Sequence, residues 1–182
     1  MKYVILLKFK DMIFKSLHNK LLNKKIEKSL TKLSLENRFK PNPIKTLACI
    51  IDPSFPISVD NFIDLSNSLG LKDKDLKIIT FQENKNIFNV FSSLNITPKC
   101  VSFSGNLTGK DSLEFISFEC DLLINFFKSN KFLTLLSSKT NAKFRVGFES
   151  VDSKLNDLIF SQKIKKYKDF KIELIKYLKM IQ

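Results

Sequence analysis

The chain of 182 residues has no tryptophan, one histidine, three cysteines, four glycines and five prolines. So little glycine and proline argues against collagen-like, linker-like and turn-rich β architectures. One histidine and three cysteines without Cys-x-x-Cys spacing leave too few ligands for a metal centre, so we predict neither a metal nor a cofactor. We expect Cys49, Cys100 and Cys120 to be free thiols in a reducing cytoplasm. No apolar run approaches the ~18 residues that a membrane span needs.

Motifs that identify common catalytic sites are missing as well. The sequence has no Gly-x-Gly-x-x-Gly after its first predicted strand, no Walker-type Gly-Lys-Ser/Thr loop and no Gly-x-Ser-x-Gly elbow. His18 stands in a lysine-rich segment and is a poor candidate for the base of a catalytic triad. We therefore predict no catalytic residue and favour a binding protein over an enzyme.

Positive charge dominates the chain, and nearly all of it is lysine. The formal net charge is +13, and only Arg38 and Arg145 are arginine. Lysine, asparagine, isoleucine and phenylalanine have A/T-rich codons, so mutational bias explains the total charge as well as an anionic partner does. The position of the charge is more informative, because residues 1–32 carry a net +7 and residues 163–182 a net +5. Charge concentrated at the ends is typical of proteins that contact nucleic acid or an anionic membrane.

Residues 1–40 are predicted to form a basic amphipathic helical segment, followed by a single domain over 45–182. An apolar series with 3–4 spacing runs through Leu6, Phe9, Ile13, Leu17, Leu21, Leu22, Ile26, Leu30 and Leu33. We expect this stripe to pack onto the domain, with adsorption to a membrane surface as the alternative. A C-terminal helix docked beside this one would merge two basic faces. The lysines expected to contact nucleic acid are Lys8, Lys15, Lys20, Lys24, Lys25, Lys28, Lys163, Lys165 and Lys166.

Short apolar runs alternate with helical patterns through the rest of the chain. Strands are predicted over 46–52, 76–81, 99–104, 120–127 and 143–149, and helices over 58–70, 111–118, 129–141 and 163–180. The segment around 155–160 is predicted to be helical. The alternation predicts an α/β, Rossmann-like three-layer domain with a mostly parallel sheet of about five strands, flanked by basic terminal helices. The residues expected to be buried in the sheet are Cys49, Ile51, Ile78, Val101, Leu123 and Val146.

Open parallel sheets bind ligands beyond the carboxyl ends of their strands. The residues that could line such a crevice are Asp52, Ser104, Gly105, Asn125, Arg145, Glu149 and Ser150. Turn and cap roles are favoured over catalysis for Asp52 and Glu149. A strand-to-helix loop is favoured over a phosphate cradle for Ser104 and Gly105. An arginine retained among so many lysines suggests a planar partner for Arg145, either Asp121 or Asp152.

The block from Asp121 to Asp157 contains the segments DLLINFF, NAKFRVGFESVD and LNDLIF. Together with the lysine-rich N-terminal helix and a strand that ends in Ile-Asp, these segments resemble an uncharacterised single-domain family of the Bacteroidota, a domain of unknown function. The resemblance implies a cytoplasmic location and a Rossmann-like fold, and it implies no activity. Residues 121–148 are also similar to the N-terminal half of heptosyltransferase-like glycosyltransferases. A chain of 182 residues is too short for the second half, where those enzymes hold the nucleotide sugar.

The sequence leads to the hypothesis of a non-enzymatic cytoplasmic protein that contacts RNA or the ribosome through its lysine-rich terminal helices. Lysine suits this role because its ammonium group binds phosphate as a point charge and reads no base sequence. A small Rossmann-like enzyme or ligand-binding domain that uses the strand-end crevice is the alternative. A peripheral membrane protein held by its N-terminal helix is a third.

Overall fold

A computed structural model describes residues 2–55, 57–83, 93–161 and 166–180, with side chains from residue 12 onward. Within these ranges the chain forms α1 (Lys2–Ser34), β1 (Leu47–Ile51), α2 (Val59–Ser68), β2 (Leu76–Phe81), β3 (Leu94–Ile96), α3 (Lys110–Ser117), β4 (Cys120–Phe126), α4 (Lys131–Lys139), β5 (Ala142–Phe148), β6 (Leu158–Phe160) and α5 (Tyr167–Met180). Short 3₁₀ turns lie at Asp73–Asp75, Pro98–Cys100 and Ser153–Leu155.

The six strands pair in parallel, in the order β3-β2-β1-β4-β5-β6. At the centre of the sheet, Cys49 of β1 is level with Ile78 of β2 and Ile124 of β4. Every residue of β1 and β4 is buried, which is the pattern of parallel strands covered on both faces. The α/β, Rossmann-like three-layer fold predicted from the sequence is therefore confirmed, with six strands in place of about five.

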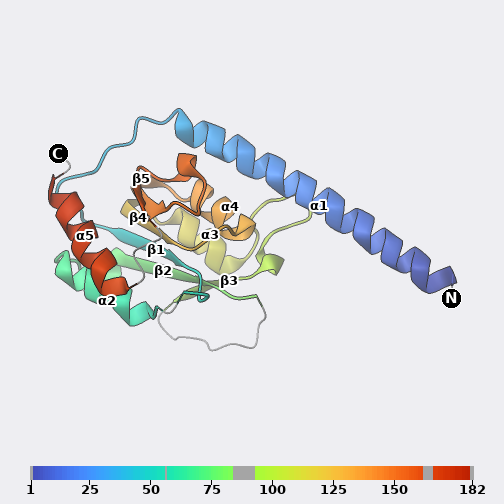
Figure 1. Ribbon diagram of the computed structural model, residues 1–182, viewed down its shortest axis with the longest axis horizontal. Helices are drawn as coiled ribbons and strands as arrows, with labels where there is room; N and C mark the ends of the chain where they lie inside the picture. Colours follow the sequence, from blue (N-terminus) through green and yellow to red (C-terminus); the bar gives the residue numbers. More distant parts are fainter. Residues whose placement is uncertain (1, 56, 84–92, 162–165, 181–182) are drawn as a thin grey trace.

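Alternate side chains of each strand belong to two separate hydrophobic cores, one on each face of the sheet. Ala48 and Ile50 of β1 point to the face covered by α1, α3 and α4. Leu47, Cys49 and Ile51 point to the face covered by α2 and α5 (Figure 1). The two lysine-rich helices thus lie on opposite faces of the sheet, so they are not docked side by side and their basic faces do not merge. The apolar stripe of α5, with Phe170, Leu174 and Leu178, fixes it in the second core.

Two of the predicted elements are wrong. Residues 99–104 do not form a strand, because Pro98 opens a 3₁₀ turn and Val101 makes only an isolated antiparallel bridge to Leu107. The edge strand β3 stands just before this turn. The segment predicted to be helical near 155–160 contains a 3₁₀ turn and the edge strand β6. Of the six residues expected to be buried in the sheet, five are buried in its strands: Cys49, Ile51, Ile78, Leu123 and Val146. Val101 is buried as well, but it lies outside the strands of the sheet.

The long helix α1 has two halves with different environments. Its C-terminal half packs on the domain through Leu22, Ile26, Leu30 and Leu33, all buried. Its N-terminal half extends beyond the rest of the molecule (Figure 1), and there Leu17 is 45% exposed. A single apolar stripe along the whole helix was expected, and only the C-terminal half of it packs onto the domain.

Gly105 allows the loop before α3 to approach the docked half of α1. Its φ of +78° is in the left-handed region, which glycine adopts without strain. A Cβ at this position would lie 3.2 Å from Leu22 Cα, so the backbone of the loop and the helix are in close contact. Next to it, His18 lies against the ring of Phe103 with ring centroids 5.8 Å apart.

Candidate nucleic-acid interface

The docked half of α1 and the end of α4 border a cationic groove of about 550 Å³. Lys25, Lys28 and Lys32 line it from α1, where spacings of three and four residues place them on one side of the helix. Lys139 joins them from the last turn of α4, and Arg145 of β5 lies beneath. The other residues of the lining are Ser29, Leu33, Glu36, Ser138, Thr140, Asn141 and Ala142. The groove lies where β5 begins, at the end of the sheet opposite to the carboxyl edge.

The four lysines of the cationic groove have little negative charge nearby. Among the described residues, no carboxylate forms an ion pair with any of them. Glu36 is the one acidic residue in the lining. Burial lowers the pKa of Lys139, and repulsion from Lys25, Lys32 and Lys28 lowers it further. Like charges gathered in this way weaken the folded state unless an anion offsets them.

Arg145 is a buried cation beneath this groove, with 1% of its surface exposed. Its Nη1 donates to the carbonyl oxygen of Ser137 at 2.8 Å, and its Nη2 donates to the carbonyl oxygen of Thr140. These carbonyls belong to the C-terminal end of α4, where free carbonyl groups carry partial negative charge. Burial lowers the pKa of Arg145 to about 10, with a further contribution from Arg38, so the guanidinium stays charged at neutral pH. Its Nε has no hydrogen-bond partner among the described residues.

The planar partner expected for Arg145 is therefore a pair of backbone carbonyls, and neither expected aspartate is its partner. Asp121 accepts hydrogen bonds from Lys143 Nζ at 2.8 Å and from the amide of Lys45 at 2.7 Å. Asp152 is exposed and accepts from the amide of Lys154 at the start of a 3₁₀ turn. Both carboxylates are thus engaged elsewhere, and within the described part of the chain Arg145 forms no ion pair.

Asp157 joins the segment after α1 to β5. Its Oδ1 accepts from Arg38 Nε at 2.8 Å, and its Oδ2 accepts from the backbone amide of Arg145 at 2.8 Å. The backbone amide of Asp157 in turn donates to the carbonyl oxygen of Arg145 at 2.8 Å. This network fixes the end of α1 relative to β5 and so supports the groove between them.

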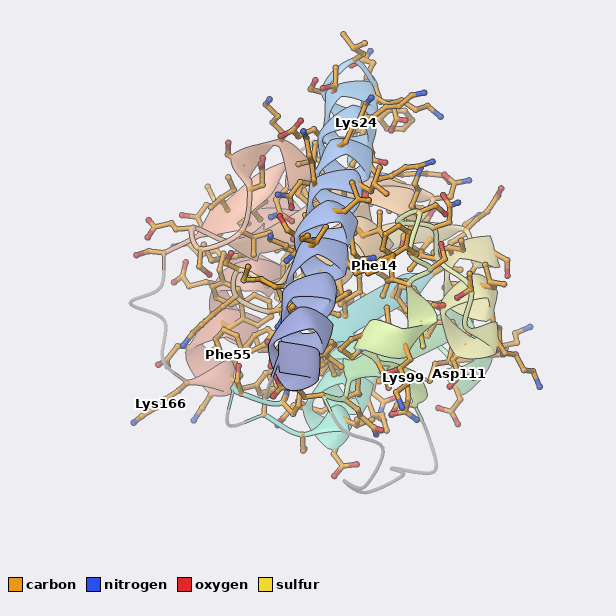
Figure 2. All side chains as sticks on the ribbon, turned by 90° about the vertical axis from the view of Figure 1, so that its right-hand side faces the viewer. Phe14, Lys24, Phe55, Lys99, Asp111 and Lys166 are labelled. Carbon is orange, nitrogen blue, oxygen red and sulfur yellow. The ribbon has the colours of Figure 1, made fainter. Side chains whose placement is uncertain are left out.

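The structure brings only part of the predicted lysine set together. Lys25 and Lys28 line the cationic groove, while Lys15, Lys20 and Lys24 are exposed elsewhere along α1. The side chain of Lys8 and the whole of Lys163 and Lys165 lie outside the described part of the chain. Lys166 is exposed just before α5, on the other side of the molecule from Lys24 (Figure 2). Lys32 and Lys139 were missed, because only the packing of α4 against α1 places Lys139 beside Lys32.

The residues predicted for a strand-end crevice have several different environments. Asp52 follows β1, and its Oδ1 accepts from the amide of Ser54 at 2.9 Å, which is a turn role. Glu149 follows β5, which is separated from β1 by β4 and hence by about 10 Å. Ser104 and Gly105 belong to the loop that contacts α1. Arg145 belongs to the cationic groove.

Asn125 and Ser150 are also placed away from the groove. Asn125 is fully buried, and its Nδ2 donates to Asn156 Oδ1 at 2.7 Å. The side chain of Asn156 lies directly over Gly147, where a Cβ would come within 2.4 Å of its Nδ2. This contact explains the glycine of the KFRVGF segment and the asparagine of the LND segment. Ser150 lines a smaller pocket of about 230 Å³ near the start of α4.

The cysteines and acidic residues do not suggest another site. Burial raises the pKa of Cys49, and burial raises that of Cys120 to about 12, which makes both thiols unreactive. Across the described residues, no group of three or more His, Cys, Asp or Glu side chains is placed to hold a metal ion. No helix in the described part of the chain is long and apolar enough to cross a bilayer.

A family model described as "Family of unknown function (DUF6913)" matches residues 18–181, from the start of the docked half of α1 to the end of α5. The chain belongs to this family. The match confirms the resemblance to an uncharacterised domain family. No curated protein and no solved structure matches the chain significantly.

Proposed function

We propose that this DUF6913 protein is a non-enzymatic, cytoplasmic binding protein that contacts structured RNA, including ribosomal RNA, through the cationic groove. Lys24, which precedes the groove lysines on α1, extends the contact surface. The observation that carries the proposal is the convergence of five cationic side chains, from α1, α4 and β5, on one concave surface lined by a single carboxylate.

Phosphate is the anion that this set of cations suits best. Lysine binds a backbone phosphate as a point charge, and several such contacts give affinity without reading base sequence. The lowered pKa of Lys139 reflects repulsion among the groove lysines in addition to burial, and phosphate oxygens between them would relieve that repulsion. Arg145 adds positive potential from below, because its guanidinium donates to backbone carbonyls and forms no ion pair among the described residues.

Two matched variants test this proposal. The groove variant replaces Lys25, Lys28 and Lys32 with glutamine, and the α5 variant replaces three exposed lysines on the opposite face, Lys166, Lys168 and Lys179. Each removes three positive charges. Fluorescence anisotropy with a labelled RNA hairpin at low salt should show roughly a 100-fold loss of affinity for the groove variant, because three phosphate contacts are lost. The α5 variant should stay within about threefold of the parent.

Co-sedimentation with ribosomes, with and without nuclease, extends the test to the cell's own RNA. We expect the parent protein to sediment with intact ribosomes and to be released by nuclease. Equal loss of RNA affinity in both variants would show that total charge matters and the groove does not. Absence of binding to RNA at any salt concentration would contradict the proposal outright.

The strand order supports a second candidate, a ligand-binding or enzymatic Rossmann-like domain. In the order β3-β2-β1-β4-β5-β6, the strands β2 and β3 extend the sheet on one side of β1, and the strands β4, β5 and β6 extend it on the other side. Rossmann-like domains bind nucleotides and related ligands at this point of reversal, between β1 and β4. The glycosyltransferase likeness of residues 121–148 suggests a half domain that binds a ligand in the crevice at the carboxyl ends of the strands. Thermal stabilisation by a nucleotide that is abolished in Asp52→Asn but retained in the groove variant would favour this second candidate.

A further inference from the structure

The apolar side chains of α1 occupy two different faces of the helix. Each residue advances about 100° around a helix axis. The buried stripe of Leu22, Ile26, Leu30 and Leu33 is therefore centred roughly 150° away from the direction of Ile13 and Leu17. Both of the latter are exposed, at 50% and 45%. The N-terminal half of α1 thus has an apolar face directed away from the domain, separate from the face that docks.

The exposed apolar side chains form a patch where α1 leaves the domain. Met12, Ile13, Phe14 and Leu17 are 45–60% exposed, although all four are large and hydrophobic. Phe103, from the loop beside Gly105, adds its ring, with its centroid 6.0 Å from that of Phe14 (Phe14 is labelled in Figure 2). In the sequence, Leu6 and Phe9 precede Ile13 at the same spacing. Exposed apolar groups gathered in this way mark interaction surfaces in soluble proteins.

The segment of α1 that carries this patch is rich in lysine. Residues 2–20 contain Lys2, Lys8, Lys10, Lys15 and Lys20, against the single carboxylate of Asp11. A second copy of the chain would bring like charges together. The apolar series from Leu6 to Leu17 is also only about 18 Å long, which is short for the ~1,200 Å² or more that a stable protein interface buries. A partner with an apolar interior and negative charge at its boundary with water fits this half of the helix better than a second copy does.

We propose that the N-terminal half of α1 lies on the surface of an anionic phospholipid membrane, independently of the cationic groove. Ile13 and Leu17 would enter the boundary between headgroups and acyl chains, and the lysines would lie at the lipid phosphates. The helix lies along the membrane and does not cross it, in keeping with its charge. The domain then stays on the aqueous side, because it packs on the opposite face of α1, and the groove lies further along the helix.

The absence of tryptophan from the chain provides a direct test. An Ile13→Trp variant has a single tryptophan, whose emission should shift to shorter wavelength with vesicles of phosphatidylcholine and phosphatidylglycerol (3:1). Ile172→Trp, at an exposed position on α5, is the matched control and should show no shift. Flotation of the parent protein with the same vesicles should fall about 100-fold in Ile13→Gln/Leu17→Gln, because two apolar side chains no longer leave water. Leu113→Gln/Ile172→Gln, which removes exposed apolar groups elsewhere, should float like the parent.

The groove variant separates this proposal from the RNA proposal. With Lys25, Lys28 and Lys32 replaced by glutamine, the Ile13→Trp emission shift should remain while RNA affinity falls. No shift with anionic vesicles, or equal flotation of Ile13→Gln/Leu17→Gln and parent, would overturn the membrane proposal. A lipid-free dimer that the same double variant dissociates would also overturn it, since a second copy would then cover the face.

Discussion

The docked half of α1 and the helix α5 are similar in composition and differ in how their charge is arranged. Residues 18–34 contain five lysines and one glutamate, and residues 167–180 contain four lysines and two acidic residues. On α5, Lys171 pairs with Asp64 at 2.6 Å and Lys176 lies 3.6 Å from Glu173. On α1, by contrast, Lys25, Lys28 and Lys32 share a groove with a further lysine, Lys139.

This difference shows how compositional bias can be separated from a binding surface. Bias toward A/T-rich codons raises the lysine content of both helices, and on α5 two of the lysines find nearby carboxylates. Codon bias does not by itself place Lys139, at the end of another helix, in the same groove as three lysines of α1. The groove, and not the net charge, is therefore the feature that favours an anionic partner.

The largest expected effects test whether both helices are equally part of the core. Leu22 of α1 and Leu174 of α5 are both fully buried, so truncation of either to alanine should cost about 2–5 kcal/mol of unfolding free energy. Leu17→Ala, on the exposed half of α1, should change it by less than about 0.5 kcal/mol. Urea denaturation followed by circular dichroism gives all three values. If Leu22→Ala resembled Leu17→Ala, α1 would not be anchored in the domain as α5 is.

A smaller effect tests the cation beneath the groove. Arg145→Lys keeps the charge but cannot reach the carbonyls of both Ser137 and Thr140, so a buried acceptor loses its donor. We expect a loss of about 1–3 kcal/mol in the same denaturation measurement. The exchange Lys131→Arg, at an exposed position of α4, is the control and should change stability little. Equal stability of Arg145→Lys and the parent would contradict the role assigned to the guanidinium.

The smallest effect concerns the titration of Lys139. Its pKa is lowered in the folded state, so the unfolded chain binds more protons between the folded and the ordinary pKa. The destabilisation caused by this group is therefore present at neutral pH and disappears as pH rises through that range. Replacing Lys25, Lys28 and Lys32 with glutamine should raise the pKa of Lys139 toward 10.5, without lowering the melting temperature. Titration of the lysine side chains by NMR measures the shift, and an unchanged pKa would show that the lysines do not interact.

Most of the fold could be predicted from the sequence because its central strands are buried on both faces. Such strands appear as continuous apolar runs, and β1, β2, β4 and β5 lie where those runs are. The edge strands β3 and β6 have three residues each, too few for a periodic pattern. The KCVSFS segment alternates as a strand does, but the turn that Pro98 opens determines its conformation. The sequence does not reveal that the apolar residues in the two halves of α1 lie on different faces of the helix. A 3–4 spacing alone does not show which of these residues the domain covers.

The candidate site could be predicted only where it is local in sequence. Lys25 and Lys28 follow from the helical pattern and the charge of residues 1–32. Lys139 stands more than a hundred residues away, and only the packing of α4 against α1 brings it to the groove. Arg145 was singled out because arginine is rare in this chain, but its partners are carbonyl oxygens, which no side-chain pattern reveals.

The salt dependence of RNA binding tests the role of the groove most directly. The logarithm of the association constant, plotted against the logarithm of salt concentration, should fall linearly for the parent protein, with a slope of about −0.9 for each duplex phosphate contact. Loss of three contacts in the Lys25, Lys28 and Lys32 variant should make the slope shallower by roughly 2–3. The Lys166, Lys168 and Lys179 variant should keep the slope of the parent. Equal slopes for the parent and the groove variant, or RNA binding that ignores salt, would contradict a phosphate-binding role for the cationic groove.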